Sequence, residues 1–101
     1  MINCEKVYDA VQQFQLNCGY EARYIDLVSE IGELGKELLK GSDYHKSSLN
    51  ITANTAEEMG DCLFSIIALC QELSINPESA LDLALEKYKQ RFVVKQGIGS
   101  D

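Results

Sequence analysis

Several residue types that mark common kinds of site are scarce in this chain. Its 101 residues include one histidine and one proline, and none of its four cysteines forms a CxxC pair. A structural zinc site needs closely spaced cysteine and histidine ligands, so this composition argues against one. The chain also lacks a repeat of solenoid period and any low-complexity tract. These absences leave an ordinary small globular domain as the expectation.

Long apolar stretches are missing as well. No run approaches the roughly 20 residues that a membrane-spanning helix needs. The first residues, MINCEK, do not have the apolar core of a secretory signal. We therefore expect a cytoplasmic protein with reduced cysteines and no contact with a membrane.

Basic residues are outnumbered. Lys and Arg total 9 against 16 Asp and Glu, which gives a net charge of -7. Such a chain repels the phosphates of nucleic acid unless a bound cation or a local basic patch intervenes. A nucleic acid polymer is therefore not an expected partner.

Helical periodicity is what the sequence does contain. Strand signals are weak, whereas apolar residues recur at steps of three and four. This pattern predicts helices over about residues 3–17, 21–40, 55–73 and 76–92. With short connections between them, these helices predict an all-α fold, a four-helix bundle, in one domain over residues 1–101.

The second and third helices carry the strongest apolar patterns. The third contains an apolar run from Cys62 to Cys70, which predicts a central and buried helix. Three neighbours from so short a chain do not cover it, so we expect a homodimer or homotetramer to complete the core. The second helix has one apolar stripe, formed by Tyr24, Leu27, Ile31, Leu34 and Leu38.

Several local signals define the predicted boundaries. Gly41 is the expected stop of the second helix. Residues 55–58, TAEE, have the form of a capping box, and Asn76 followed by Pro77 is typical of a helix start. Residues 42–54 are a polar loop between two helices. Residues 93–101 are predicted to be a loosely held tail.

Acidic residues form two motifs with the same spacing. Glu30 and Glu33 are three apart on the second predicted helix, and Glu58 and Asp61 are three apart on the third, so each pair shares a helix face. Both pairs lie beside apolar positions, where a carboxylate without a partner is costly or becomes protonated. We predict that the four bind a divalent cation. Oxygen ligands favour magnesium, which manganese can replace, and a solvated helix face is the alternative for either pair alone.

A glycine stands inside each acidic pair, Gly32 in the first and Gly60 in the second. Glycine in the middle of a helix costs about 1 kcal/mol relative to alanine. Its presence at both positions predicts either a close approach of the two helices or room for a ligand.

Together the two motifs resemble the MazG-like family of all-α nucleoside triphosphate pyrophosphohydrolases. The family pattern is EExxE, a spacer and ExxD, which reads here as SEIGE at 29–33 and EMGD at 58–61. The likeness extends over residues 27–40 and 57–92. Its last part, EKYKQRF at 86–92, is similar to the closing helix of the family, which often reads KNxxRF.

The resemblance implies a reaction and the residues that perform it. A nucleoside triphosphate would be hydrolysed to the monophosphate and pyrophosphate, with magnesium at the carboxylates, as part of clearing unwanted nucleotides. Glu33 or Glu30 would orient or deprotonate the attacking water. Ser29 departs from the family pattern, since it replaces the first Glu of EExxE, and it leaves the number of ions open.

Residues of the last predicted helix are candidates for substrate binding. Lys87 and Arg91 are one turn apart and suit a phosphate; a solvated helix end that favours the helix dipole is the alternative. Tyr88, where the family frequently has Asn, joins them as a candidate sugar or base contact. Two other functions stay open. A phosphoribosyl-ATP pyrophosphatase-like enzyme would rescue a histidine auxotroph, and a non-catalytic helical interaction module would hydrolyse no nucleotide.

Overall fold

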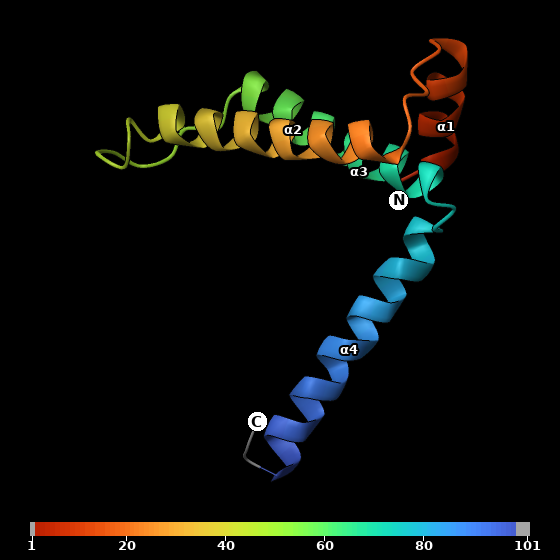
Figure 1. The fold of residues 1–101 in the computed structure, drawn as a ribbon. Helices are drawn as coiled ribbons and strands as arrows, with labels where there is room; N and C mark the ends of the chain where they lie inside the picture. Colours follow the sequence, from red (N-terminus) through yellow and green to blue (C-terminus); the bar gives the residue numbers. More distant parts are fainter. Residues whose placement is uncertain (1, 99–101) are drawn as a thin grey trace.

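The computed structural model describes residues 2–98, and the side chains of residues 2–95. Over this range the chain is all-α, as predicted. The helices are α1 (Cys4–Gln13), α2 (Tyr20–Gly41), α3 (Ala53–Glu72) and α4 (Pro77–Ile98). Figure 1 shows α2 and α3 side by side, α1 standing across one end of this pair, and α4 extending away from the same end. None of these helices has both the length and the apolar character needed to cross a membrane.

Helices α1, α2 and α3 end in the same way. The first residue beyond each C-cap has a positive φ, and the following amide donates to a carbonyl five residues back, which is the Schellman motif. The residues with positive φ are Gln15 (55°), Asp43 (48°) and Ser74 (55°). The amide-to-carbonyl pairs are Leu16 to Val11, Tyr44 to Leu39 and Ile75 to Cys70. None of the three positions with positive φ is a glycine.

Gly41 therefore has a different role from the predicted one. It is the last residue of α2, but Asp43 is the residue that turns the chain. The amide of Asn50 donates to the carbonyl of Gly41 at 2.8 Å. A Cβ on Gly41 would lie 2.7 Å from the carbonyl oxygen of Asn50. Glycine is needed here because the loop after α2 folds back onto the helix end.

The start of α3 corrects the predicted capping box. Thr52 is the N-cap, and its hydroxyl accepts from the amide of Thr55 at 3.4 Å. The hydroxyl of Thr55 in turn accepts from the amide of Thr52 at 3.2 Å. The box therefore joins Thr52 to Thr55, and the prediction that Thr55 pairs with Glu58 was wrong. As a result Glu58 has no capping role and is available to other partners.

Two helix lengths also differ from the prediction. α1 ends at Gln13 rather than near Asn17, because its Schellman motif turns the chain at Gln15. α4 continues past Phe92 to Ile98, since no proline or glycine interrupts it before Gly97. That residues 93–98 are loosely held stays a prediction, and residues 99–101 lie outside the described range.

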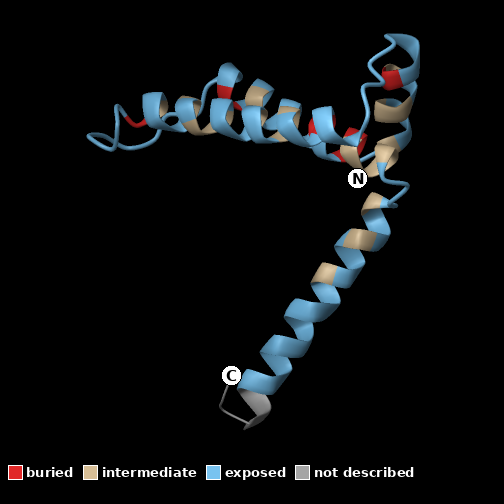
Figure 2. Ribbon diagram, in the orientation of Figure 1, coloured by how far each residue is buried: buried red, intermediate tan, exposed pale blue. Residues whose placement is uncertain are grey.

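Burial is concentrated where α1, α2 and α3 meet (Figure 2). The buried residues there include Val11, Ser65, Ile67 and Ala68. The predicted stripe of α2 is only partly used, since Leu27 and Leu34 are half-buried while its other members are exposed: Tyr24 by 60%, Ile31 by 55% and Leu38 by 38%. Burial of α3 is also partial, with Leu63 and Ile66 exposed.

The single chain is open in shape. Its radius of gyration is 17.3 Å, whereas a compact domain of this length has about 13 Å. Extensive helix–helix packing among the described residues is confined to α2 with α3 and α1 with α3. α4 is exposed along nearly its whole length (Figure 2). Completion of the core by further copies of the chain stays a prediction.

Candidate metal centre

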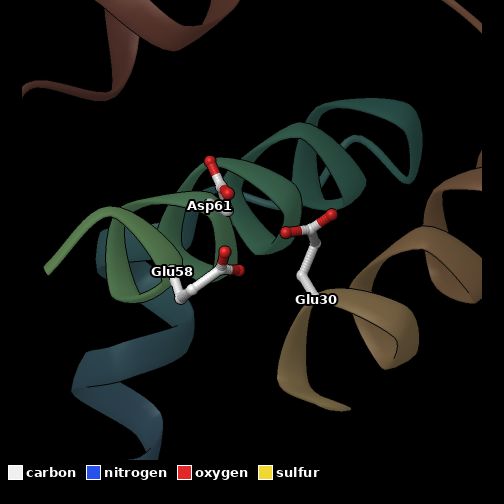
Figure 3. A group of neighbouring side chains, drawn as sticks. All are labelled: Glu30, Glu58 and Asp61. Carbon is white, nitrogen blue, oxygen red and sulfur yellow. The ribbon is translucent and has the colours of Figure 1, made fainter. Parts of the chain in front are cut away.

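Three of the four predicted carboxylates meet between α2 and α3. Glu30 comes from α2, and Glu58 and Asp61 come from successive turns of α3 (Figure 3). Each offers one oxygen, and these three oxygens lie within 4.8 Å of one another. Glu58 and Asp61 share a face because they are three residues apart. The side-by-side packing of the two helices brings Glu30 to that face.

The electrostatics of this cluster are unfavourable without a cation. Partial burial raises the pKa of Glu30, and the charges of Asp61, Asp26 and Glu58 raise it further. The pKa of Glu58 is raised first by desolvation and then by the charges of Asp61 and Glu33. In the part of the chain that the structure describes, no lysine or arginine forms an ion pair with Glu30, Glu58 or Asp61. Clustered carboxylates without a basic partner fit a divalent cation with oxygen ligands.

Glu33 lies at the edge of this cluster. Its side chain is exposed, and it is not one of the three residues whose oxygens converge. Its charge nevertheless reaches Glu58, whose pKa it helps to raise. The role of Glu33 as a metal ligand stays a prediction.

Open space adjoins both acidic pairs. A side chain at Gly32 or at Gly60 would meet no neighbouring atom within 4 Å. Close approach of the two helices is therefore not the reason for these glycines. The remaining interpretation, room for a ligand, stays a prediction.

A polar network beside the cluster was not predicted from the sequence. The hydroxyl of Ser65 on α3 donates to Asp26 on α2 at 3.0 Å. Arg23, which is only 6% exposed, forms an ion pair with Asp26 at 3.6 Å. Its guanidinium also donates to the carbonyl of Leu16 at 2.6 Å and lies over the ring of Phe64. The only signal in the sequence is the three-residue spacing of Arg23 and Asp26, which does not reveal burial.

This network fixes the two helices relative to each other. Asp26 is one turn before Glu30 on α2, and Ser65 is one turn after Asp61 on α3. The hydrogen bond between Asp26 and Ser65 therefore sets the register in which Glu30 faces Asp61. Arg23 connects the same point to the segment between α1 and α2.

The predicted substrate-binding residues lie elsewhere. Lys87 and Arg91 flank the ring of Tyr88, with Lys87 Nζ at 5.3 Å and Arg91 Cζ at 5.6 Å from its centroid. All three are exposed on α4. The structure groups them together but does not bring them to the carboxylates of the same chain. Their role in binding substrate stays a prediction.

This protein is helical over the described residues, and two of its packed helices bring carboxylates together. Helical proteins of this class can bind a hard divalent cation between their helices. Comparison with known families makes this class specific. The pattern of the MazG nucleotide pyrophosphohydrolase domain matches residues 19–93, and the chain belongs to this family. The match includes α2, α3 and most of α4, and with them all four predicted carboxylates. The predicted resemblance to this family is thereby confirmed.

One curated relative matches over a shorter stretch. It is described as "Nucleoside triphosphate pyrophosphohydrolase/pyrophosphatase MazG" and comes from Thermotoga maritima. The two are 53% identical over 36 residues, which are 36% of this chain and 14% of the relative. The chain therefore matches only a small part of that relative. No solved structure matches the chain.

Proposed function

We propose that this protein is a magnesium-dependent nucleoside triphosphate pyrophosphohydrolase. It would convert a (d)NTP and water to the (d)NMP and pyrophosphate, in the cytoplasm, as part of clearing the nucleotide pool. The observation that carries this proposal is the convergence of Glu30, Glu58 and Asp61 within 4.8 Å. Family membership over residues 19–93 supports the reaction class.

In this proposal Glu30, Glu58 and Asp61 hold the cation. Bound there, magnesium supplies charge neutralisation of the triphosphate and polarisation of the attacked phosphorus. The like charges that raise the pKa of Glu30 and Glu58 are the same charges that a cation compensates. A cation at this place also allows a chain of net charge -7 to accept a polyanion.

Glu33 is the carboxylate that we assign to the attacking water. It is exposed at the edge of the cluster, beside Glu58, and is not among the three converging residues. A carboxylate in that position can orient the water or accept its proton. Glu30 is the alternative, but it is drawn into the group of three. Asp26 and Ser65 act on the site through position, because their hydrogen bond holds α2 in register with α3.

We also propose that the active form is a homodimer or a homotetramer. The single chain exposes 7720 Å², while a compact protein of 11.3 kDa exposes about 5,700 Å². Exposed apolar side chains account for much of this surface, including most of those on α4. A further copy of the chain would cover them.

A pyrophosphate-release assay tests the proposed function. The common NTPs and dNTPs are each incubated with the full chain in magnesium, in manganese and in EDTA. The expected products are pyrophosphate and the nucleoside monophosphate, formed only with a divalent cation. Release of orthophosphate and diphosphate in their place, or no hydrolysis of any nucleotide, would overturn the proposal.

A further inference from the structure

Two of the four cysteines lie where α1 packs across the end of α3 (Figure 1). Cys4 is the first residue of α1, and Cys70 lies in the last turn of α3. Both are half-buried, and both line one apolar cavity between α1, α3 and the first turns of α4. Its lining also includes Leu63, Ile67 and Leu81. The fold therefore brings together two thiols that are far apart in the sequence.

The electrostatics of these thiols agree with the shared cavity. Partial burial raises the pKa of Cys70, and the charge of Cys4 raises it further. Tyr8 lies one turn after Cys4 on α1, and its pKa is raised by desolvation and then by the charges of Cys4 and Cys70. Charges act on each other this way only over short distances in salt. The three side chains therefore form one cluster at the contact of α1 with α3.

Cys4 also lines a second cavity, which has a polar lining. This cavity lies between the starts of α1 and α4, and its lining includes Asn3, Glu5, Asn76 and Glu78. All four of these residues are exposed. Cys4 therefore stands between a cavity that water reaches and the apolar cavity that contains Cys70. A small polar oxidant can reach the Cys4 sulfur from the side of the second cavity.

The other two cysteines lie elsewhere. Cys18 is exposed in the segment between α1 and α2, where it lines a separate cavity beside Arg23. Cys62 lies near the carboxylate cluster, since burial raises its pKa and the charges of Glu30 and Asp61 raise it further. Neither cysteine is among the described residues that line the cavity of Cys4 and Cys70. The structure thus selects one pair from the four.

We infer that Cys4 and Cys70 are a thiol pair that hydrogen peroxide joins as a disulfide within one chain, which fixes α1 on α3. The Cys4 sulfur attacks one peroxide oxygen, so that an S–O bond forms, the O–O bond breaks, and the released hydroxide leaves with the thiol proton as water. The Cys70 sulfur then attacks the sulfenic acid of Cys4. The S–S bond forms, the S–O bond breaks, and the Cys70 proton leaves in a second water. Two electrons pass from the two sulfurs to the peroxide.

Burial sets the order of these two steps. The thiolate is the attacking form of a cysteine. The raised pKa of Cys70 keeps its thiol protonated, while Cys4 borders the cavity that water reaches, so the first step falls to Cys4. A dithiol opens the bond again by thiol–disulfide exchange. Such a pair is reduced in a reducing compartment and closes only when peroxide is present.

The bond acts on the fold and not on the carboxylates. Val11 is the buried residue of α1 and lies two turns after Cys4, so the bond holds the opposite end of this short helix. It closes a loop of about 65 residues, and a cross-link over so long a loop restricts the unfolded chain strongly. Cys70 lies about 14 Å along α3 from Asp61. The inference therefore goes beyond the proposed function and does not depend on it.

Oxidation of the reduced full chain tests the inference. The protein is freed of reductant and treated with equimolar hydrogen peroxide, the remaining thiols are alkylated in denaturant, and the chain is mapped by mass spectrometry without reduction. The expected product is a disulfide between Cys4 and Cys70 of one chain, which dithiothreitol reverses. At the same protein concentration, the oxidised protein should melt about 10 °C or more above the reduced protein.

Serine variants supply the controls. Cys4→Ser and Cys70→Ser each remove one sulfur, so each should lose both the disulfide and the rise in Tm on oxidation. Cys18→Ser makes the same change at an exposed thiol and should respond to peroxide as the wild type does. Circular dichroism of each reduced variant checks its helix content. If Cys70→Ser does not fold, Cys4→Ser at the start of α1 carries the test alone.

Three results would overturn the inference. The first is that Cys4 and Cys70 remain separate thiols, or become separate sulfinic acids, after the peroxide treatment. The second is a disulfide that joins two chains or that includes Cys18 or Cys62. The third is a disulfide between Cys4 and Cys70 that leaves Tm unchanged, because α1 would then not be fixed by it. None of these measurements involves nucleotide hydrolysis, so failure of the proposed function is seen separately in the pyrophosphate-release assay.

Discussion

The α2–α3 pair and α4 offer a direct comparison, because α2 and α4 are both 22 residues long. α2 finds a neighbour in its own chain, and the contact creates both the core and the carboxylate cluster. α4 carries an exposed apolar seam, formed by Leu81, Leu85, Tyr88 and Phe92, but among the described residues it packs extensively against no other helix. An apolar stripe therefore specifies that a helix will pack, without specifying which chain supplies the partner.

The sharpest contrast between the two regions should come from buried charge. Ala68 on α3 is 1% exposed, so Ala68→Asp places a carboxylate where it has no partner. We expect a loss of about 4 kcal/mol or more in the free energy of unfolding, measured by urea denaturation. On α4, Leu83→Asp is the matched control, because Leu83 is 74% exposed and lies away from the seam; it should change stability little. Comparable losses for the two variants would show that α3 and α4 do not differ in how strongly packing stabilises them.

A charge in the α4 seam should act on assembly rather than on the fold. Leu85→Asp places a carboxylate in the apolar contact proposed between copies. The sedimenting mass should fall towards that of one chain, 11.3 kDa, while α1, α2 and α3 stay helical by circular dichroism. An unchanged mass would mean that this seam is not an interface.

The register of the α2–α3 pair should depend on Ser65. Ser65→Ala removes the hydrogen bond to Asp26 and should lower the free energy of unfolding by about 1 kcal/mol. It should also slow turnover, because Glu30 would be held less firmly opposite Asp61. The control is Ser79→Ala on α4, where the side chain is exposed. A Ser65→Ala protein with wild-type stability would show that this bond does not fix the register.

The smallest effect concerns pH in protein without metal. The pKa values of Glu30 and Glu58 are raised in the folded state, so the folded state favours their neutral forms. The stability they contribute is complete below their unfolded pKa, about 4.3, and is lost as the pH rises through the raised values. In EDTA, Glu30→Gln should therefore raise Tm at pH 7 and leave it nearly unchanged at pH 4.

Magnesium provides the complement to this experiment. It should raise the Tm of wild-type protein at pH 7 and do so less at lower pH, because protons compete for the same oxygens. Glu30→Gln should show a smaller response to the ion. A Glu30→Gln protein that melts below wild type in EDTA at pH 7 would contradict the proposed repulsion between Glu30 and its neighbouring carboxylates.

Local sequence signals predicted the helices well, and three of the four acids that they singled out converge in the structure. Periodicity and three-residue spacing act within one helix, so they need no knowledge of the rest of the fold. Boundaries were harder to predict. Both Thr52 and Thr55 begin a sequence that suits a helix cap, and the structure uses the earlier one. A glycine was the expected stop of α2, but Asp43 takes the left-handed conformation.

Contacts between helices were the least predictable part. The α2 stripe suggested that Tyr24 and Ile31 face the core, yet both are exposed while Arg23 is buried. Arg23 can be buried because it has an ion pair with Asp26 and a carbonyl acceptor at Leu16. Such partners come from the packing of distant segments, which a pattern within one helix does not encode. The same limit explains why the separation of α4 from its own carboxylates was not foreseen.

The most direct test of the metal-dependent site compares two acids on α3. Asp61 is one of the three converging carboxylates, whereas Glu57 is an exposed acid on the same helix and outside this group. Pyrophosphate release in magnesium is measured for the wild type, Asp61→Asn and Glu57→Gln, with helix content checked for each. The account predicts that Asp61→Asn lowers kcat/KM at least about a hundredfold and that Glu57→Gln stays close to wild type. Full turnover by a folded Asp61→Asn protein would contradict it.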